Sequence, residues 1–348
     1  MKRKAFSVFI VLSLAFSMFA FTGCGESGGE DEVFHFNVSF MNPEPAAAGI
    51  VEALDRIQEA SNGRITMTYY FSWALTSVAT IIDDFNSGIV DIGVHSFEND
   101  TFFPYANLIT NTPFLGMPSI HEAARIFAEM YEDYPVLAEE FARNGIVFWT
   151  LQPFPSTQLY TRSDFEIRMP SDLAGRRIIT NLPMLQEFLS NNGAAGVSAP
   201  VTDISTMINT GVADGVMQHP GVMLAFGVLD FLEGATFYGP GGILSAMGSI
   251  SFSEQAWNRL PADLQQLFID EADNVREAMA SLQYVVNMPV NDRLIEQVPV
   301  QQLSDAEIQA WLDDFAPIID AHVETMIGRG HTEARNILDS VRARIAAR

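Results

Sequence analysis

The stretch YTRSDFEIRMPSDLAGRRIITNLPMLQEFLSNNGAAGVSAPVTDISTMINTGVADGVMQHP, residues 160–220, decides the fold. The segments at 176–181 and 212–217 have the length of strands. The segments 185–191 and 203–210 are followed by glycine and predict helices, because glycine commonly terminates a helix. With an extended segment at 194–200, the order is strand, helix, strand, helix, strand. This order predicts parallel strands covered by helices.

The region before this stretch shows the same succession. Strands are expected at 33–41, 64–71 and 89–94, with helices at 44–62 and 77–86. Ligands of such sheets bind beyond the carboxyl ends of the strands. This rule makes Trp73, after the second strand, and Glu98, after the third, candidate ligand-binding residues.

Two changes in composition divide the chain into two lobes. Pro153 and Pro155 mark a first crossing, and the segment GPGG at 239–242 marks the return. We predict lobe I over 33–152 and 243–348, including the C-terminal helices, and lobe II over 153–242. Because lobe II is inserted through two hinge strands, the two lobes are expected to close on a ligand.

The N-terminus has the pattern of an export signal. A basic start at 2–4 precedes an uncharged run at 5–21, which ends close to Cys24. The run is shorter than the roughly 20 apolar residues that a membrane-spanning helix needs. The sequence FTGC at 21–24 resembles a bacterial lipobox. We therefore predict a lipoprotein signal peptide over 1–23, lipidation of Cys24, and a flexible acidic tether over 24–32.

The charge of the chain argues against nucleic-acid binding. The formal net charge is −24 at pH 7, and removal of the three basic residues of the signal makes it −27. Binding to phosphate needs clustered lysine and arginine. After Cys24 the chain has no lysine, and its basic residues are 16 arginines. Since arginine stays protonated above the lysine pKa of about 10.4, this usage indicates an alkaline or saline habitat, with genomic codon bias as the alternative.

The sequence contains no common catalytic pattern. It has no G-x-S-x-G, no phosphate loop, no H-E-x-x-H and no cysteine besides Cys24, and its six histidines include no pair at i, i+4. We therefore predict that the protein is not an enzyme and uses no cofactor and no metal. Aromatic residues at expected strand ends or loops indicate an apolar ligand pocket, with core packing as the alternative for each. They are Trp73, Phe97, Phe114, Trp149, Tyr160 and Tyr238.

Six segments together resemble one protein family. They are NGRI at 62–65, SGIVDIG at 87–93, TPFL at 112–115, DLAGRRI at 172–178, GVADG at 211–215 and AWNRLP at 256–261. Their order and spacing are similar to those of the solute-binding proteins of tripartite ATP-independent periplasmic (TRAP) transporters. The resemblance implies an α/β fold of the periplasmic-binding-protein type II, with two lobes of mixed or parallel sheets joined by hinge strands.

The resemblance also implies a function. Such a protein captures a small organic solute, an organic acid or a less polar relative, and delivers it to an ion-driven TRAP membrane permease. We expect an extracytoplasmic location, a lipid anchor to the membrane, and the solute and the permease subunits as partners. A solute-binding component of an ABC-type uptake system and a ligand-presenting sensor module remain as alternatives.

One position departs from the family pattern. The family motif D-L-x-G-x-K-I-R ends in an arginine that grips the solute carboxylate, and at 172–179 this arginine falls on Ile179. Either Arg177, on the same strand face, reaches the site, or Arg162 enters it, or the solute is not held by a carboxylate here. We favour the third interpretation, because burial of an unpaired carboxylate is costly.

The remaining candidates come from strand faces and strand ends. Asn181 shares the face of Arg177 and Ile179, and 217–219 follow the Asp-Gly of the last inner strand. For Glu98 a solvent-exposed position is the alternative. The predicted ligand-binding residues are Trp73, Glu98, Phe114, Gln158, Arg177, Ile179, Asn181, Met217 and His219.

Overall fold

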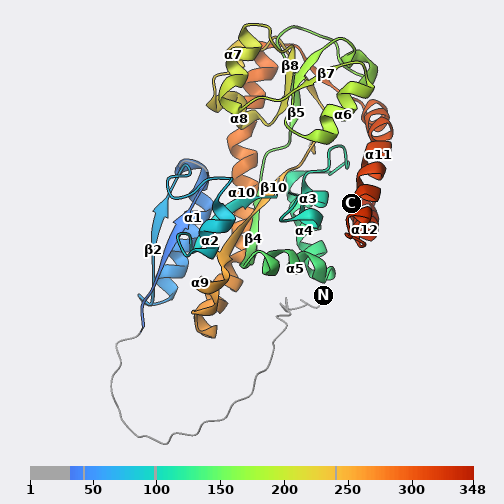
Figure 1. Cartoon of the computed structure of the whole chain (residues 1–348). Helices are drawn as coiled ribbons and strands as arrows, with labels where there is room; N and C mark the ends of the chain where they lie inside the picture. Colours follow the sequence, from blue (N-terminus) through green and yellow to red (C-terminus); the bar gives the residue numbers. More distant parts are fainter. Residues whose placement is uncertain (1–31, 42–43, 98–99, 240) are drawn as a thin grey trace, which may run out of the picture.

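The computed structural model describes residues 32–41, 44–97, 100–239 and 241–348. Two sheets with flanking helices make up two lobes, one above the other in Figure 1. The predicted division into two α/β lobes is therefore visible in the order of the elements. The predicted signal peptide, Cys24 and nearly all of the tether lie outside the described residues.

The sheet of lobe I has five strands in the order β2-β1-β3-β10-β4. The strands are β1 (Phe34–Ser39), β2 (Ile65–Tyr70), β3 (Ile92–Ser96), β4 (Ile146–Pro153) and β10 (Met247–Ser253). β1 pairs in parallel with β2 and β3, whereas β10 is antiparallel to both β3 and β4. β4 therefore runs in the same direction as β1, β2 and β3. The helices are α1 (Glu44–Ala60), α2 (Ile81–Asn86), α3 (Pro104–Thr110), α4 (Ile120–Asp133), α5 (Pro135–Arg143) and α9 (Glu254–Asn258).

The sheet of lobe II has six strands in the order β11-β9-β5-β8-β6-β7. The strands are β5 (Gln158–Thr161), β6 (Arg177–Ile179), β7 (Ala195–Val197), β8 (Gly215–Gln218), β9 (Gly234–Phe237) and β11 (Val300–Gln302). β5 is antiparallel to its neighbours β8 and β9, and the other pairs are parallel. The helices are α6 (Pro183–Asn191), α7 (Ile204–Asn209) and α8 (Pro220–Ala225), with 3-10 turns η1 (Pro170–Leu173), η2 (Val201–Asp203) and η3 (Leu229–Phe231).

The strand directions place the carboxyl ends of the parallel strands between the lobes. The chain passes from the end of β4 at Pro153 to the start of β5 at Gln158, and it returns from β9 to β10. The carboxyl ends of β1 to β4 therefore point toward lobe II. The carboxyl ends of β6 to β9 point toward lobe I, because β5 runs antiparallel to β8 and β9. We call these two facing rows of strand ends the interlobe edges.

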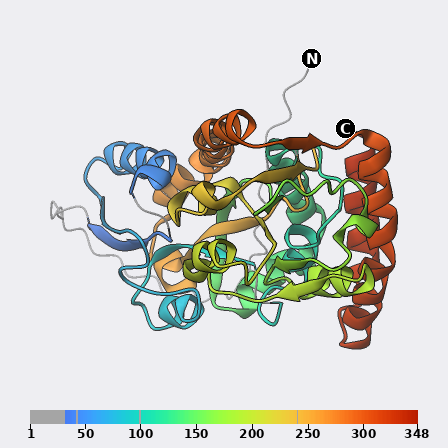
Figure 2. The ribbon, with the colours of Figure 1, turned by 90° about the horizontal axis from the view of Figure 1, so that it is seen from above.

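The C-terminal segment does not stay in lobe I as expected. Helix α10 (Ala262–Gln297) leaves lobe I and reaches lobe II, where Leu294 lies in the hydrophobic core. β11 then pairs with β9 of the lobe II sheet. In Figure 2 the chain continues through β11 into α11 (Asp305–Gly328) at the periphery, and α12 (Ala334–Ala346) contacts α3 and α4 of lobe I. Residues 243–348 thus contribute to both lobes.

Local sequence explains several helix boundaries. The hydroxyl of Ser253 accepts a hydrogen bond from the N–H of Ala256 and caps α9, and Ser304 and Glu307 form a reciprocal capping box at α11. The helical segment over 120–143 is divided into two helices, α4 and α5. It breaks at Tyr134, which adopts an extended backbone, because the residue before a proline disfavours the helical conformation.

A buried aromatic cluster joins the lobes at their side. It consists of Phe114 from lobe I, Phe188 and Tyr238 from lobe II, and Trp311 and Phe315 from α11. The rings of Phe114 and Trp311 are stacked with centroids 5.6 Å apart, and those of Phe188 and Trp311 are 5.5 Å apart. Aromatic contacts of this kind stabilise beyond the area they bury, so α11 holds the two lobes together here.

Candidate functional site

Six of the predicted ligand-binding residues lie at the interlobe edges. Trp73 follows β2, Gln158 begins β5, Ile179 ends β6, and the others lie at or just after the ends of β6 and β8. The six are Trp73, Gln158, Ile179, Asn181, Met217 and His219. Glu98 follows β3 in the sequence but lies outside the described residues. The rule that strand ends form the site thus selects residues from both lobes.

Arg177 lies at the opposite end of β6 and is held by a carboxylate there. Its Nε and Nη2 donate to Oδ2 and Oδ1 of Asp214 at 3.0 and 2.8 Å, and its backbone N–H donates to the same carboxylate at 2.9 Å. The guanidinium favours the ionised carboxyl, which lowers the pKa of Asp214. The interpretation in which Arg177 reaches the solute is therefore corrected.

Arg162 also lies away from the interlobe edges. It follows β5, whose carboxyl end is the end remote from lobe I, and its backbone N–H donates to the carbonyl of Asp214 at 3.0 Å. Gly215, beside Asp214, pairs so closely with β5 that a Cβ would lie 2.7 Å from the carbonyl oxygen of Tyr160. The GVADG segment therefore fixes strand packing at the remote end of lobe II.

Two predicted polar residues use their side chains to position backbone at the edge of lobe II. Asn181 exchanges hydrogen bonds with Ala199, donating to its carbonyl at 3.0 Å and accepting from its N–H at 3.1 Å. Gln158 donates to the carbonyl of Gly239 at 3.1 Å and accepts from the N–H of Tyr238 at 2.8 Å. Both amides therefore shape the edge, and the Asn181 amide is the more exposed of the two.

Three predicted apolar residues are packed in the core. Phe114 is 5% exposed within the interlobe aromatic cluster, Met217 is 5% exposed, and Ile179 is 2% exposed among the apolar residues of lobe II. Phe114 therefore serves the packing between the lobes rather than an open surface. Trp73 is only partly buried, and it adopts a positive φ of 59° while its N–H donates to the carbonyl of Phe40.

His219 is the predicted residue with the clearest unused hydrogen-bonding capacity. It stands at the N-terminus of α8, directly after β8, and its Nδ1 is buried without a hydrogen-bond partner among the described residues. Burial disfavours the charged imidazolium and lowers the pKa of His219 to about 4. The ring is therefore neutral at pH 7, with one nitrogen able to donate and the other able to accept a hydrogen bond.

Sequence reasoning missed two polar residues at the edge of lobe I. Ser39 is the last residue of β1 and Gln152 is the penultimate residue of β4, and both are fully buried. The hydroxyl of Ser39 and the Oε1 of Gln152 have no partner among the described residues. Ser39 lies near the end of the strand expected at 33–41, but burial of a lone serine or glutamine cannot be read from the local sequence.

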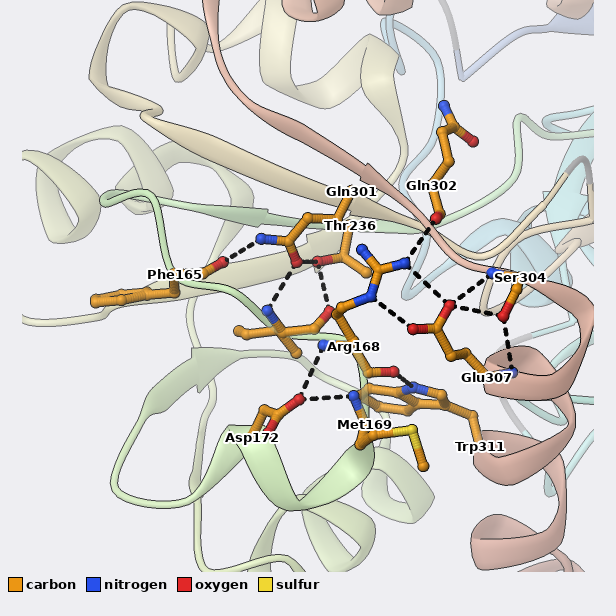
Figure 3. Close-up of polar contacts among 11 residues, drawn as sticks. Phe165, Arg168, Met169, Asp172, Thr236, Gln301, Gln302, Ser304, Glu307 and Trp311 are labelled. Carbon is orange, nitrogen blue, oxygen red and sulfur yellow. Dashed lines mark hydrogen bonds and ion pairs between the residues drawn. The ribbon is translucent and has the colours of Figure 1, made fainter.

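The turn that leads into the DLAGRRI segment is held in place by α11, as Figure 3 shows. Arg168 binds Glu307 through Nε at 2.5 Å and Nη2 at 3.1 Å, and the Nε1 of Trp311 donates to the carbonyl of Arg168 at 2.8 Å. The carboxylate of Asp172 accepts from the N–H groups of Arg168 and Met169. The aspartate of this segment therefore caps a turn, and the turn is fixed to α11.

A surface pocket of about 220 Å³ lies elsewhere, between α3 and the end of α11. Asp100, His322, Arg329 and His331 line it, and Arg329 forms an ion pair with Asp100 at 3.5 Å. None of the predicted ligand-binding residues lines this pocket. Among the described residues, no group of three or more histidine, cysteine or acidic side chains is placed to hold a metal ion.

Comparison with known proteins identifies the family. Residues 42–325 match the family model described as bacterial extracellular solute-binding protein, family 7. The chain belongs to this family. No curated protein sequence matches the chain. The predicted recognition as a solute-binding protein of the TRAP type is confirmed.

Solved TRAP solute-binding proteins share the fold. A protein of Rhodoferax ferrireducens T118 with copurified benzoate is 20% identical at a TM-score of 0.76, over 90% of this chain and 98% of that one. A Bordetella bronchiseptica protein with bound (R)- and (S)-mandelate is 21% identical at a TM-score of 0.74, over 90% of this chain and 99% of that one. A Sulfitobacter protein with bound β-D-galacturonate is 16% identical at a TM-score of 0.72, over 89% of this chain and 99% of that one. The predicted fold class is confirmed.

Family membership settles the broad function and location. This family 7 protein is an extracytoplasmic solute-binding component of transport, as predicted. Within the described ranges, no helix combines the length and apolarity needed to cross a membrane.

Proposed function

We propose that this family 7 protein captures a small organic solute between its two lobes and delivers it to an ion-driven TRAP permease. The observation that carries the proposal is the convergence of six predicted residues on the interlobe edges, together with the buried unpaired Nδ1 of His219. Related proteins of this fold hold benzoate, mandelate or galacturonate. A small organic acid or a less polar relative is therefore the class of solute to test first.

The test begins with the protein expressed without residues 1–23. Native mass spectrometry reports a bound small molecule directly, and a thermal-shift screen of organic acids and their uncharged analogues detects binding because a bound ligand stabilises the folded state. We expect at least one compound to raise the melting temperature in a concentration-dependent way. A chain that carries no small molecule and gains no stability from any compound would contradict solute capture.

The transporter partner is tested by genetics. Deletion of adjacent genes for one small and one large membrane protein should abolish uptake of the solute in whole cells. If a neighbouring ATPase gene were required instead, the partner would be an ABC-type transporter. If a neighbouring kinase responded to the solute without uptake, the protein would be a sensor module.

The proposed membrane attachment depends on Cys24. Lipidation of this cysteine and removal of 1–23 would leave the folded lobes tethered to the outer face of the membrane by the Gly-rich, acidic segment that follows. Cells that express the full chain should incorporate labelled fatty acid into the protein, whereas Cys24→Ser should abolish labelling and release the protein. Equal labelling of both would refute the anchor.

The proposed role requires no catalysis and no cofactor. The solute should therefore be recovered unchanged after prolonged incubation with the protein, as judged by mass spectrometry of the supernatant after denaturation. A product formed in proportion to protein concentration would identify an enzyme instead.

A further inference from the structure

Buried uncharged polar atoms without a partner concentrate at the interlobe edges. The described residues contain five uncharged side chains with such an atom, and each lies on or next to a strand of the two sheets. Ser39 ends β1, Gln152 is penultimate in β4, Tyr160 is third in β5, and His219 and Tyr238 directly follow β8 and β9. Four of them are at least nine-tenths buried: Ser39, Gln152, Tyr160 and Tyr238.

These atoms come from both lobes and are neutral. Ser39 and Gln152 belong to the lobe I sheet, and the other three to the lobe II sheet. Hydroxyl groups both donate and accept hydrogen bonds, the amide oxygen of Gln152 accepts, and a neutral imidazole nitrogen does one or the other. A buried polar atom that lacks a partner is costly, so Ser39, Gln152 and His219, at or next to strand ends of the interlobe edges, point to a ligand that supplies partners. The rings of Tyr160 and Tyr238 pack into hydrophobic clusters.

No cationic side chain accompanies these groups in the sequence. The three residues that follow each of β1 to β4, β6 to β9 and β11 include no lysine and no arginine. The three residues that precede β5 and β10 include none either. A carboxylate at the interlobe edges would therefore lack the bidentate guanidinium partner that suits it best.

Most of the arginines are engaged in ion pairs. Of the 16 that follow Cys24, 13 form ion pairs with described carboxylates. Two of these pairs lie at the remote strand ends of the lobes. Arg259 binds Asp91, which directly precedes β3, and Arg177 binds Asp214, which directly precedes β8.

The energetic consequence separates two classes of solute. A carboxylate that moves from water into a closed interlobe site loses its hydration, and without a cation it regains only neutral hydrogen bonds. The net charge of −27 after signal removal adds long-range repulsion of anions. An uncharged solute with hydroxyl, carbonyl or amide groups exchanges hydrogen bonds with water for hydrogen bonds with Ser39, Gln152 and His219 and pays no such charge penalty.

We propose that the solute of this protein is uncharged and is held by hydrogen bonds from neutral side chains, with Ser39, Gln152 and His219 among them. The inference rests on the proposed function and names the class of solute for the same site. It departs from the related proteins that hold organic acids.

The test uses matched pairs that differ in one carboxylate. The protein without residues 1–23 is titrated by calorimetry with benzamide against benzoate, mandelamide against mandelate, and D-galactose against D-galacturonate. For any pair that binds, we expect the uncharged member to bind at least about tenfold more tightly, which corresponds to about 1.4 kcal/mol. We also expect its affinity to change less than about twofold between low and high salt, because salt screens charges.

Variants assign the binding to the interlobe edges. Gln152→Met and His219→Gln should each lower the affinity for the uncharged ligand about threefold to tenfold, the usual range for one lost hydrogen bond. Gln266→Met and His35→Gln are the matched controls, because they change exposed residues of α10 and β1 remote from these edges. Both should leave the affinity for the uncharged ligand unchanged. Ser39→Ala removes only a hydroxyl, so it tests the assigned residues even if a larger change prevents folding.

The outcomes distinguish the two proposals. Tighter binding of the acid in the pairs that bind would overturn the uncharged class and leave solute capture intact. Binding of the uncharged member that none of the three variants weakens would overturn the assigned residues and this inference with them. If no member of any pair binds and native mass spectrometry finds no small molecule, the failure lies with the proposed function itself.

Discussion

Arg177 and Asp214 form a two-pronged ion pair at the end of lobe II that is remote from lobe I, with N to O distances of 3.0 and 2.8 Å. The same carboxylate accepts the N–H of Arg177, so a single aspartate fixes both the side chain and the start of β6. Asp91 occupies the equivalent place in lobe I, where it accepts from Arg259 and from the N–H of Asn37. Both aspartates belong to segments that resemble the family, and here both fix strands.

This arrangement predicts a structural role for Asp214. Asp214→Ala should lower the free energy of unfolding more than Arg177→Gln does, by roughly 1–3 kcal/mol, because it also leaves the partly buried N–H of Arg177 without an acceptor. Urea denaturation of the two variants measures the difference. Arg177→Gln should leave the affinity for any solute unchanged, and a large loss of affinity would return Arg177 to the binding site.

Because the carboxyl of Glu140 is buried, we expect the protein to lose stability as the pH rises toward neutral. Burial raises the pKa of this carboxyl from 4.5 to about 7, although its oxygens accept from the N–H groups of Tyr105 and Ala106 at 2.6 and 3.0 Å. The protonated form is favoured in the folded state. The contribution of Glu140 to the free energy of unfolding therefore falls as the pH rises from about 4.5 to about 7, by about 3 kcal/mol in total.

Denaturation of Glu140→Gln at several pH values between 5 and 8 checks this. The variant should lose that part of the pH dependence, whereas Glu139→Gln on the exposed face of α5 should keep it. Parallel pH profiles for wild type and Glu140→Gln would rule out the buried carboxyl as the source.

Because the imidazole of His95 is buried, we expect the protein to lose stability in acid. The imidazole is 1% exposed, contacts the hydroxyl groups of Ser249 and Ser251 at 2.7 and 3.1 Å, and has its pKa lowered by burial from 6.5 to about 4. Between these values the unfolded chain binds a proton that the folded chain does not. The free energy of unfolding should therefore fall as the pH drops from about 6.5 to about 4, by about 3 kcal/mol for this residue.

The slope of stability against pH is the quantity to measure for His95. His95→Gln is expected to be less stable at pH 7 but less sensitive to acid between pH 6.5 and 4. His35→Gln, which changes an exposed histidine of β1, should keep the wild-type slope. An unchanged slope in His95→Gln would assign the acid sensitivity to other groups.

Because Trp311 of α11 packs against Phe114 of lobe I and Phe188 of lobe II, we expect the two lobes to unfold together. Trp311→Phe keeps a ring in the aromatic cluster but leaves the carbonyl of Arg168 without its hydrogen bond, which should cost about 1–3 kcal/mol. Because the cluster has rings from both lobes, calorimetry should show a broader or divided unfolding transition in this variant. Trp257→Phe, in the core of lobe I beside Phe252, should lower the melting temperature without dividing the transition.

The periodic segments predicted much of the fold. The predicted strand ends lie close enough to the observed ones to put Trp73, Asn181 and His219 at the interlobe edges. Short apolar runs and glycines that terminate helices are local signals, so they can be read from the sequence. The return of 300–302 to the lobe II sheet was missed, since three residues of β11 carry no periodic pattern of their own.

By itself, the sequence determined the family and the two α/β lobes. These follow from residue identity and from spacing along the chain. Only the tertiary structure decided that Arg177 and Arg162 lie at the remote end of lobe II and that Phe114 packs against Trp311. It also showed that Ser39, Gln152 and His219 are buried with unpaired polar atoms. Burial and pairing depend on residues that are distant in sequence and meet only when both sheets have formed.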